Sequence, residues 1–233
     1  MTDRGIMFSK PMILALDRKT QTRRLATSYL RRCEPGDRLW VREAFAAEEL
    51  SRPARTVKAS AREKRASGRT TVLLHDELDG ADGLRYLADD AWVKIENSPE
   101  AADDWMTVYH YGLKEGESPK GRRGRGIPAM HMPRWASRTT LIVEAVRTEP
   151  LQSISAEDAI AEGLIWRPAL QAWAAMPDES WPTFTDPRRS YAGLWQHLHK
   201  KEGERWNDNP NVLVLTFRVI RSNIDQMEAN HGG

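Results

Sequence analysis

The densest group of chemically useful side chains lies between residues 19 and 24. Lys19, Thr22 and Arg24 stand in the run Lys-Thr-Gln-Thr-Arg-Arg, where a short predicted helix ends. A lysine that is crowded by cations and partly removed from water loses proton affinity and can act as a base. A threonine hydroxyl three residues away could then be the nucleophile that this lysine activates. A solvated polar surface is the other interpretation of such a run.

Other catalytic and metal-binding signatures are missing. The chain contains no Walker loop, no dinucleotide-binding glycine motif, no serine-hydrolase elbow and no zinc-protease motif. His197 and His199 are two residues apart in a predicted helix, so their side chains diverge and do not suit a shared metal. Cys33 follows two arginines but has no histidine nearby, which favours a free surface thiol over a nucleophile. We therefore expect neither a metal nor another cofactor.

Short strands with interspersed helices must position these residues. Alternating apolar residues predict strands at 6–8, 38–42, 139–146 and 212–220. Helices are predicted at 11–17, at 156–162 and from Ser190 onward, with Leu194, Trp195 and Leu198 on one face. The order of elements lacks a regular strand–helix alternation. It predicts an α+β fold with a small mixed sheet or a partly closed barrel, and not a Rossmann fold.

Two helix boundaries have clear chemical signals. Ser155 and Asp158 form the pattern of a helix N-cap, and Gly163 stands where a left-handed residue would end that helix. Ser190 is the expected N-cap of the last long helix.

Length and composition favour one sizeable domain. The 233 residues are 40% hydrophobic and include one cysteine, which excludes a disulfide scaffold. The nine tryptophans suit either a tryptophan-rich core or stacking on bases. Residues 46–125 lack clean periodicity, and we expect them to be a partly flexible insertion. Residues 222–233 are expected to be a tail.

The net charge of +2 conceals three blocks of unequal charge. Residues 18–69 hold 15 Lys and Arg against 6 Asp and Glu, whereas residues 75–105 hold 2 against 10. Residues 120–138 hold 6 basic residues and no acidic one, and the glycine-rich part at 112–126 is expected to be a basic loop. Such blocks favour an anionic partner, although two solvated faces would give the same counts.

Nothing near the N-terminus has the pattern of a signal peptide. Lys10 and Pro11 interrupt the mildly apolar stretch from Met7 to Leu16. No run approaches the roughly 20 apolar residues that a membrane span requires. We expect a cytoplasmic protein that does not contact a membrane.

Six motifs taken together resemble the ASCH domain, a branch of the PUA-like superfamily. They are Lys10–Met12, Lys19–Arg24, Leu39–Glu43, His131–Arg138, Glu157–Gly163 and Trp206–Pro210. The set is most similar to the longer phage and prophage-encoded members. The resemblance covers residues 5–45 and 126–221, and it implies a PUA-like mixed β-barrel with flanking helices and a cleft for a nucleobase or RNA.

The resemblance also implies a reaction. Small bacterial ASCH members hydrolyse the acyl amide of N4-acetylcytidine with a lysine, a threonine and a glutamate, which correspond here to Lys19, Thr22 and Glu162. Lys19 would take a proton from Thr22, or from a water that Thr22 positions. Glu162 would protonate the departing amine, and Arg24 would stabilise the oxyanion.

Departures from the small enzymes leave other functions open. This chain carries the 46–125 insertion and a tryptophan-rich segment at 165–188, and it has Asp17 where those enzymes have glycine. Trp40, Arg134 and Trp135 would suit stacking on a base with phosphates alongside. A non-catalytic module that binds RNA (in preference to DNA) or a modified base, and a ribonuclease, are therefore the alternatives. The sequence does not indicate an oligomeric state.

Overall fold

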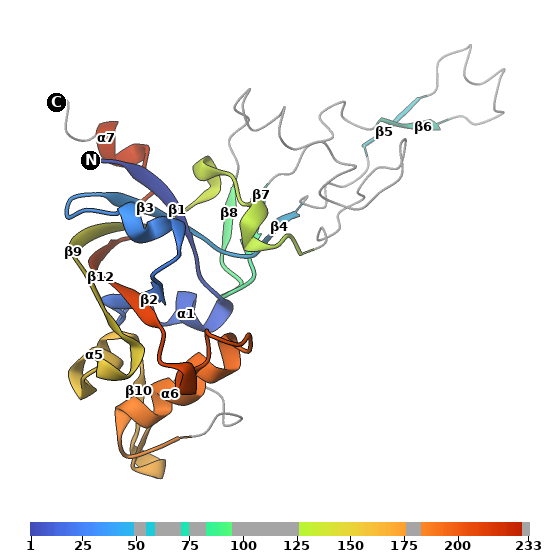
Figure 1. Cartoon of the computed structure of the whole chain (residues 1–233). Helices are drawn as coiled ribbons and strands as arrows, with labels where there is room; N and C mark the ends of the chain where they lie inside the picture. The colour runs from blue at the N-terminus through green and yellow to red at the C-terminus, as the bar shows by residue number, and fades with distance from the viewer. Residues whose placement is uncertain (49–54, 59–70, 75–82, 95–125, 176–182, 230–233) are drawn as a thin grey trace. The chain divides into compact units, whose positions relative to one another are not determined.

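In the computed structural model the chain divides into two compact units, residues 1–44 with 128–233 and residues 45–127 (Figure 1). The structure describes residues 1–48, 55–58, 71–74, 83–94, 126–175 and 183–229. The second unit spans nearly the residues expected to form an insertion. Of the basic loop expected at 112–126, residues 112–125 lie outside the described residues. Within the described ranges no helix has the length and apolar character needed to cross a bilayer.

A five-stranded mixed sheet forms the core of the first unit. Its strands, in spatial order, are β1 (Asp3–Met7), β3 (Arg38–Arg42), β9 (Thr140–Pro150), β12 (Asn211–Ile220) and β2 (Gln21–Leu25). β1 and β3 are parallel, and the other neighbours are antiparallel. The α+β class is therefore confirmed. Among the described residues this sheet is open, with β1 and β2 at its edges, and the expected closure into a barrel is not seen.

Short helices surround this sheet. They are α1 (Lys10–Leu14), α5 (Ala156–Ala161), α6 (Pro187–Leu198), α7 (Gln226–Ala229) and the 3-10 turns η1 (Tyr29–Arg32), η2 (Ala129–His131), η3 (Arg134–Ala136), η4 (Leu151–Ser153), η5 (Pro168–Leu170) and η6 (Trp206–Asp208). A hairpin of β10 (Ile165–Arg167) and β11 (Ala172–Ala174) lies between α5 and α6 along the chain.

The described residues of the second unit form two small antiparallel sheets. One has the order β4 (Phe45–Glu48), β7 (Gly83–Tyr86) and β8 (Trp92–Lys94), and the other pairs β5 (Arg55–Lys58) with β6 (Thr71–Leu74). Phe45 and Ile127, at the two ends of the unit, form an isolated β-bridge. The chain therefore enters and leaves this unit at adjacent points.

The residues that bound α5, Ser155 before it and Gly163 after it, are those predicted from the sequence. The Ser155 hydroxyl accepts a hydrogen bond from the Asp158 backbone N–H at 3.0 Å. Gly163 has φ +99°, a left-handed conformation that glycine adopts without a steric penalty. A Cβ at this position would lie 2.9 Å from the Cβ of Ala15. Glycine is thus required both for the turn and for the close approach of the segment that carries Lys19.

The predicted start of α6 is wrong by one helical turn. The helix begins at Pro187, and the Asp186 side chain caps it by accepting a hydrogen bond from the Arg188 N–H at 2.9 Å. Proline at the first helical position has a suitable φ and lacks only an N–H that would have no helical partner. Ser190 instead lies within the helix, where its hydroxyl donates to the Trp173 carbonyl at 2.8 Å. This hydrogen bond joins α6 to the β10–β11 hairpin.

The segment expected to be a tail is anchored at its start. Ile224 is fully buried, and the Asn223 side-chain amide donates to the carbonyl of Ser137 at 2.7 Å. The same amide lies within hydrogen-bond distance of two further carbonyls in the 134–135 turn. The chain therefore contributes to the packed core beyond β12, up to residue 224.

Candidate functional site

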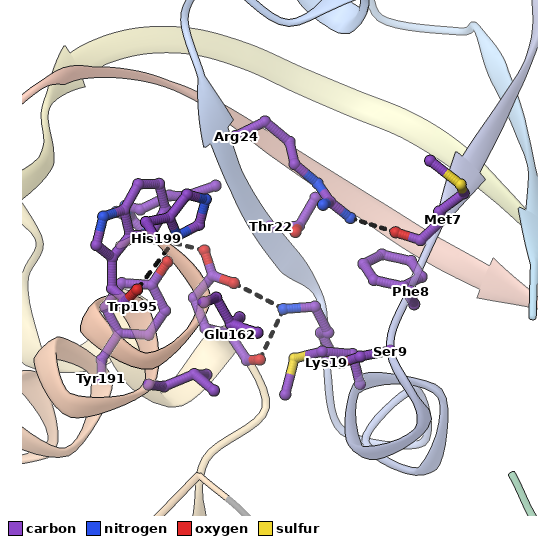
Figure 2. Close-up of a pocket in the computed structure, with 14 residues that line it drawn as sticks. Met7, Phe8, Ser9, Lys19, Thr22, Arg24, Glu162, Tyr191, Trp195 and His199 are labelled. Atoms are coloured by element: carbon purple, nitrogen blue, oxygen red, sulfur yellow. Dashed lines mark hydrogen bonds and ion pairs between the residues drawn. The ribbon is translucent and has the colours of Figure 1, made fainter. Parts of the chain in front are cut away.

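A buried ion pair joins Lys19 to Glu162. Lys19 Nζ lies 2.6 Å from Glu162 Oε2 and 2.7 Å from the backbone carbonyl oxygen of the same residue (Figure 2). The two side chains are only 1% and 4% exposed. Lys19 is among the largest fully buried side chains in the described part of the protein, which is an unusual place for an ammonium group.

Backbone hydrogen bonds hold the two partners together. Thr20 N–H donates to the carbonyl of Ala161 at 2.9 Å, and Phe217 N–H donates to the carbonyl of Thr20 at 2.9 Å. The chain around Lys19 is therefore clamped between the end of α5 and strand β12. Since Glu162 is the C-cap of α5, its position is fixed by the same contacts.

Arg23 holds the other oxygen of Glu162. Its Nη1 lies 3.2 Å from Glu162 Oε1, and its Nη2 lies 2.7 Å from Glu149 and 2.9 Å from Asp158. The Arg23 side chain is fully buried. Arg147 pairs with Glu149 and Asp158 as well, so the carboxylates around Arg23 are themselves held in place. No role was predicted for Arg23 from the sequence. The available signal was the alternation along β2, which places neighbouring residues such as Arg23 and Arg24 on opposite faces of the sheet.

A cavity of about 240 Å³ opens beside the ion pair. Thr22 and Arg24 line it from β2, together with Lys19 and Glu162 (Figure 2). Arg23 also contributes from β2, and the remaining lining comes from β1, α1 and the segment between them, and from α6 with its C-cap: Met7, Phe8, Ser9, Met12, Tyr191, Leu194, Trp195, Leu198 and His199. The predicted catalytic residues Lys19, Thr22 and Glu162 are thus brought together in one cavity.

The Arg24 guanidinium is bound to the protein through Nη2, whereas its Nε is available to a ligand. Its Nη2 donates to the carbonyl of Met7 at 2.6 Å, and its guanidinium lies 5.2 Å from the centre of the Phe8 ring. Its Nε is buried and has no hydrogen-bond partner within the described ranges. A buried N–H without a partner is costly, so an oxygen entering the cavity would find a donor there.

Burial shifts the acid–base chemistry of the site. It lowers the pKa of Lys19, which the nearby charges of Arg23 and Arg24 lower further and the contact with Glu162 opposes. Burial also raises the pKa of Tyr191 well above its ordinary value, and the Glu162 carboxylate adds to this effect. Tyr191 therefore stays neutral and is hydrogen-bonded to Glu162. Lys19 loses its proton more readily than a lysine in water.

Three residues expected to bind substrate lie elsewhere. Trp40, Arg134 and Trp135 are not among the residues that line the cavity. Trp40 is 9% exposed and is covered by the guanidinium of Arg42, 4.4 Å from the ring centre. Arg134 is bound to the carboxylates of Asp3 and Asp225. The structure therefore does not bring this group together with Lys19.

One wall of the cavity was not foreseen. Tyr191, Trp195 and His199 line it from α6 and its C-cap. The spacing of four residues, which places side chains on one helix face, was the available signal. From the sequence, only Leu194, Trp195 and Leu198 were predicted to share a helix face, so Tyr191 and His199 were missed. Tyr191 and Trp195 are almost fully buried.

The described residues contain no group of three or more His, Cys, Asp or Glu side chains placed to hold a metal ion. Comparisons with protein-family models, with curated proteins and with solved structures found no match to this chain.

Proposed function

We propose that this protein is an amidohydrolase that removes the acyl group from an N4-acylated cytidine or a closely similar modified base, on a PUA-like fold of the ASCH type. The observation that carries the proposal is the 2.6 Å contact between Lys19 and Glu162 in a cavity that Thr22 and Arg24 also line. A buried, preorganised acid–base pair beside a hydroxyl and an arginine suits the cleavage of an amide.

The shared proton between Lys19 and Glu162 is central to the mechanism. Transfer of one proton across this contact turns an ammonium–carboxylate pair into an amine and a carboxylic acid with the same total charge. The amine is the base and the carboxylic acid is the proton donor that amide hydrolysis requires. Because burial lowers the pKa of Lys19, the amine form of this lysine is more accessible here than in water.

The proposed bond changes are as follows. Lys19 removes a proton from the Thr22 hydroxyl, or from a water that Thr22 positions, and the oxygen attacks the acyl carbon. Arg24 donates to the oxyanion that forms. Glu162 protonates the exocyclic nitrogen as the carbon–nitrogen bond breaks. When water attacks directly, this step releases the carboxylic acid and cytidine. When Thr22 attacks, cytidine leaves first and the acyl group stays on Thr22 as an ester; a water deprotonated by Lys19 then hydrolyses that ester, releasing the carboxylic acid and returning a proton to the Thr22 oxygen. Either route consumes one water overall.

The size of the cavity supports a small substrate. Pockets for drug-sized ligands typically measure about 300–1,000 Å³. A cavity of about 240 Å³ suits one acylated base with part of its sugar. The apolar lining from Phe8, Trp195 and Leu194 would exclude water from the reacting amide.

The direct test is deacylation of N4-acetylcytidine, followed by chromatographic separation of substrate and cytidine. Lys19→Met and Glu162→Gln should each reduce turnover by about 10²-fold or more, as expected when a positioned acid or base is lost. Lys201→Met is the matched control for the lysine, because Lys201 is 79% exposed. Glu202→Gln, also at an exposed position, is the control for the glutamate.

Two outcomes would overturn this proposal. Wild-type protein that turns over neither N4-acetylcytidine nor longer N4-acyl cytidines is one of them. Turnover that is unchanged in both site variants is the other. Salt-dependent RNA binding without turnover would indicate the base-binding alternative, and RNA cleavage that requires Lys19 would indicate a nuclease.

A further inference from the structure

His199 occupies the C-cap position of α6 and lines the cavity beside Trp195 (Figure 2). Its ring is stacked on the Trp195 indole, with ring centres 3.9 Å apart and planes inclined by 13°. Its Nδ1 lies 3.2 Å from the Trp195 carbonyl oxygen, which also accepts the backbone N–H of His199 at 2.9 Å. Stacking and hydrogen bonding together fix the orientation of the imidazole.

This contact also fixes the tautomer. A carbonyl oxygen can only accept a hydrogen bond, so Nδ1 carries the proton. In the neutral ring Nε2 then holds a lone pair, on the edge of the imidazole directed away from the helix backbone. Burial lowers the pKa of His199, and the charge of Arg24 lowers it further, while Glu204 and the bond to Trp195 act in the opposite direction. The neutral ring, with its acceptor nitrogen, is therefore the form present near neutral pH.

The other acceptors beside His199 are already engaged. Glu162 accepts from Lys19 on Oε2 and from Arg23 on Oε1, and Tyr191 is hydrogen-bonded to it as well. Within the described part of the chain, Nε2 of His199 makes no hydrogen bond. A donor group on a ligand would find an available acceptor at this wall of the cavity.

We propose that His199 is a specificity-determining residue that accepts, through Nε2, a hydrogen bond from an N–H or O–H group of the substrate. This inference rests on the proposed function, because it concerns the ligand of the same cavity. An N4-acylated cytidine offers two sources of such a donor, the amide N–H at N4 and the hydroxyls of the sugar. Both would be lost to His199 if the imidazole became protonated, since Nε2 would then be a donor.

The test compares three variants on N4-acetylcytidine. His199→Phe keeps an aromatic ring against Trp195 and removes both nitrogens. His199→Gln places an amide oxygen near the position of Nε2 and so restores an acceptor. His197→Phe is the matched control, because His197 is exposed on the same helix and does not line the cavity. KM and kcat are measured for each variant, and Kd is measured by calorimetry in a Thr22→Val background.

His199→Phe should raise KM and Kd by about tenfold, the value of one well-made hydrogen bond, and should leave kcat within about twofold. His199→Gln should recover at least half of that loss, and His197→Phe should match the wild type. KM of the wild type should rise as the pH falls below the ordinary range of histidine, and His199→Phe should abolish that rise. Repeating the series with N4-acetylcytosine identifies the donor: an effect that persists indicates the amide N–H, and one that vanishes indicates a sugar hydroxyl.

The failures of the two proposals are distinguishable. Turnover by the wild type with KM and Kd unaffected in His199→Phe overturns the role of His199 and leaves the proposed function intact. Binding without turnover overturns the proposed function, and the Kd series still decides the role of His199. A wild-type protein that does not bind N4-acetylcytidine overturns both. A glutamine variant as weak as the phenylalanine variant also contradicts the assigned acceptor role, provided that both variants melt within a few degrees of the wild type.

Discussion

Arg23 and Lys19 bind opposite oxygens of one carboxylate: Nη1 of Arg23 lies 3.2 Å from Oε1 of Glu162, and Nζ of Lys19 lies 2.6 Å from Oε2. The carboxylate therefore cannot rotate without losing one of the two bonds. Its Oε2 stays directed at the amine with which it would exchange a proton. Under the proposed function, this arrangement gives Arg23 a positioning role, and both the stability of the fold and the activity should depend on Arg23, Lys19 and Glu162.

Removing one member of the Lys19–Glu162 pair should destabilise the fold. Lys19→Met leaves a buried carboxylate with fewer partners, and the expected cost is about 3–5 kcal/mol in the free energy of unfolding. The double variant Lys19→Met/Glu162→Met removes both buried charges and should recover most of that loss while remaining inactive. Urea unfolding measures the stabilities. A double variant as unstable as the single one would show that packing, and not the unpaired charge, is responsible.

Arg23→Lys should reduce kcat by about 10²-fold, because a lysine has one point charge and cannot bind three carboxylates in the planar geometry of a guanidinium. The pH profile of kcat should shift as well, since Glu162 would no longer be held on Oε1. The same substitution at Arg188, which is more than half exposed, is the control. An unchanged pH profile of kcat in Arg23→Lys would show that Arg23 has only a structural role.

Gly163→Ala should destabilise the protein by about 1–3 kcal/mol, because φ of +99° is strained for alanine and its Cβ would meet that of Ala15 at 2.9 Å. Gly193→Ala provides the opposite case. A Cβ on Gly193 would meet nothing within 4 Å, and in the helix α6 alanine should stabilise by about 0.5–1 kcal/mol. Thermal melting of the two variants checks the signs, and equal effects would contradict the backbone argument.

Stability should fall in acid through Glu149 and Asp158. Partial burial alone would raise the pKa of both carboxyls, but hydrogen bonds from Arg23 to each of them, with those from Arg147 to Glu149 and from Gln21 to Asp158, lower it overall. A carboxyl whose folded pKa lies below its unfolded value stabilises the fold fully above the unfolded pKa of about 4. That contribution is lost as the pH falls from there through the lowered folded pKa.

Urea unfolding at a series of pH values tests this dependence. The variant Glu149→Gln/Asp158→Asn should show a flatter profile below about pH 5 than the wild type. A variant that follows the wild-type profile would place the acid-sensitive groups elsewhere in the protein.

The site was partly predictable because its first half is local in sequence. Lys19 and Thr22 are three residues apart, so their proximity could be inferred from the chain alone. Glu162 was reached only through the resemblance to the ASCH domain, since nothing in its neighbours shows that the end of α5 packs on residues 15–20. The distinction between Arg23 and Arg24 depends on which face of β2 each occupies. That requires the position of α5, which a linear pattern does not contain.

The alternation of apolar and polar residues predicted where the strands lie in the sequence, but it could not predict which strands pair in the sheet. The apolar run of β12 identified it correctly, whereas its pairing with β2 on one side and β9 on the other joins segments far apart in sequence. The α6 boundary was misplaced because Asp186–Pro187 was considered part of a tryptophan-rich loop. The wall of aromatic side chains on α6 shows the same difficulty, because apolar helix faces look alike whether they cover a core or a cavity.

The clamp of Thr20 between Ala161 and Phe217 has a consequence for synthesis on the ribosome. Lys19 emerges 143 residues before Glu162, and β12, which closes the clamp, is made later still. Until then the segment around Lys19 lacks both of these contacts, and β2, whose neighbour in the described sheet is β12, has no native strand partner. Contacts of such long sequence separation slow folding, so the buried Lys19–Glu162 pair forms only as a late event in the folding of each molecule.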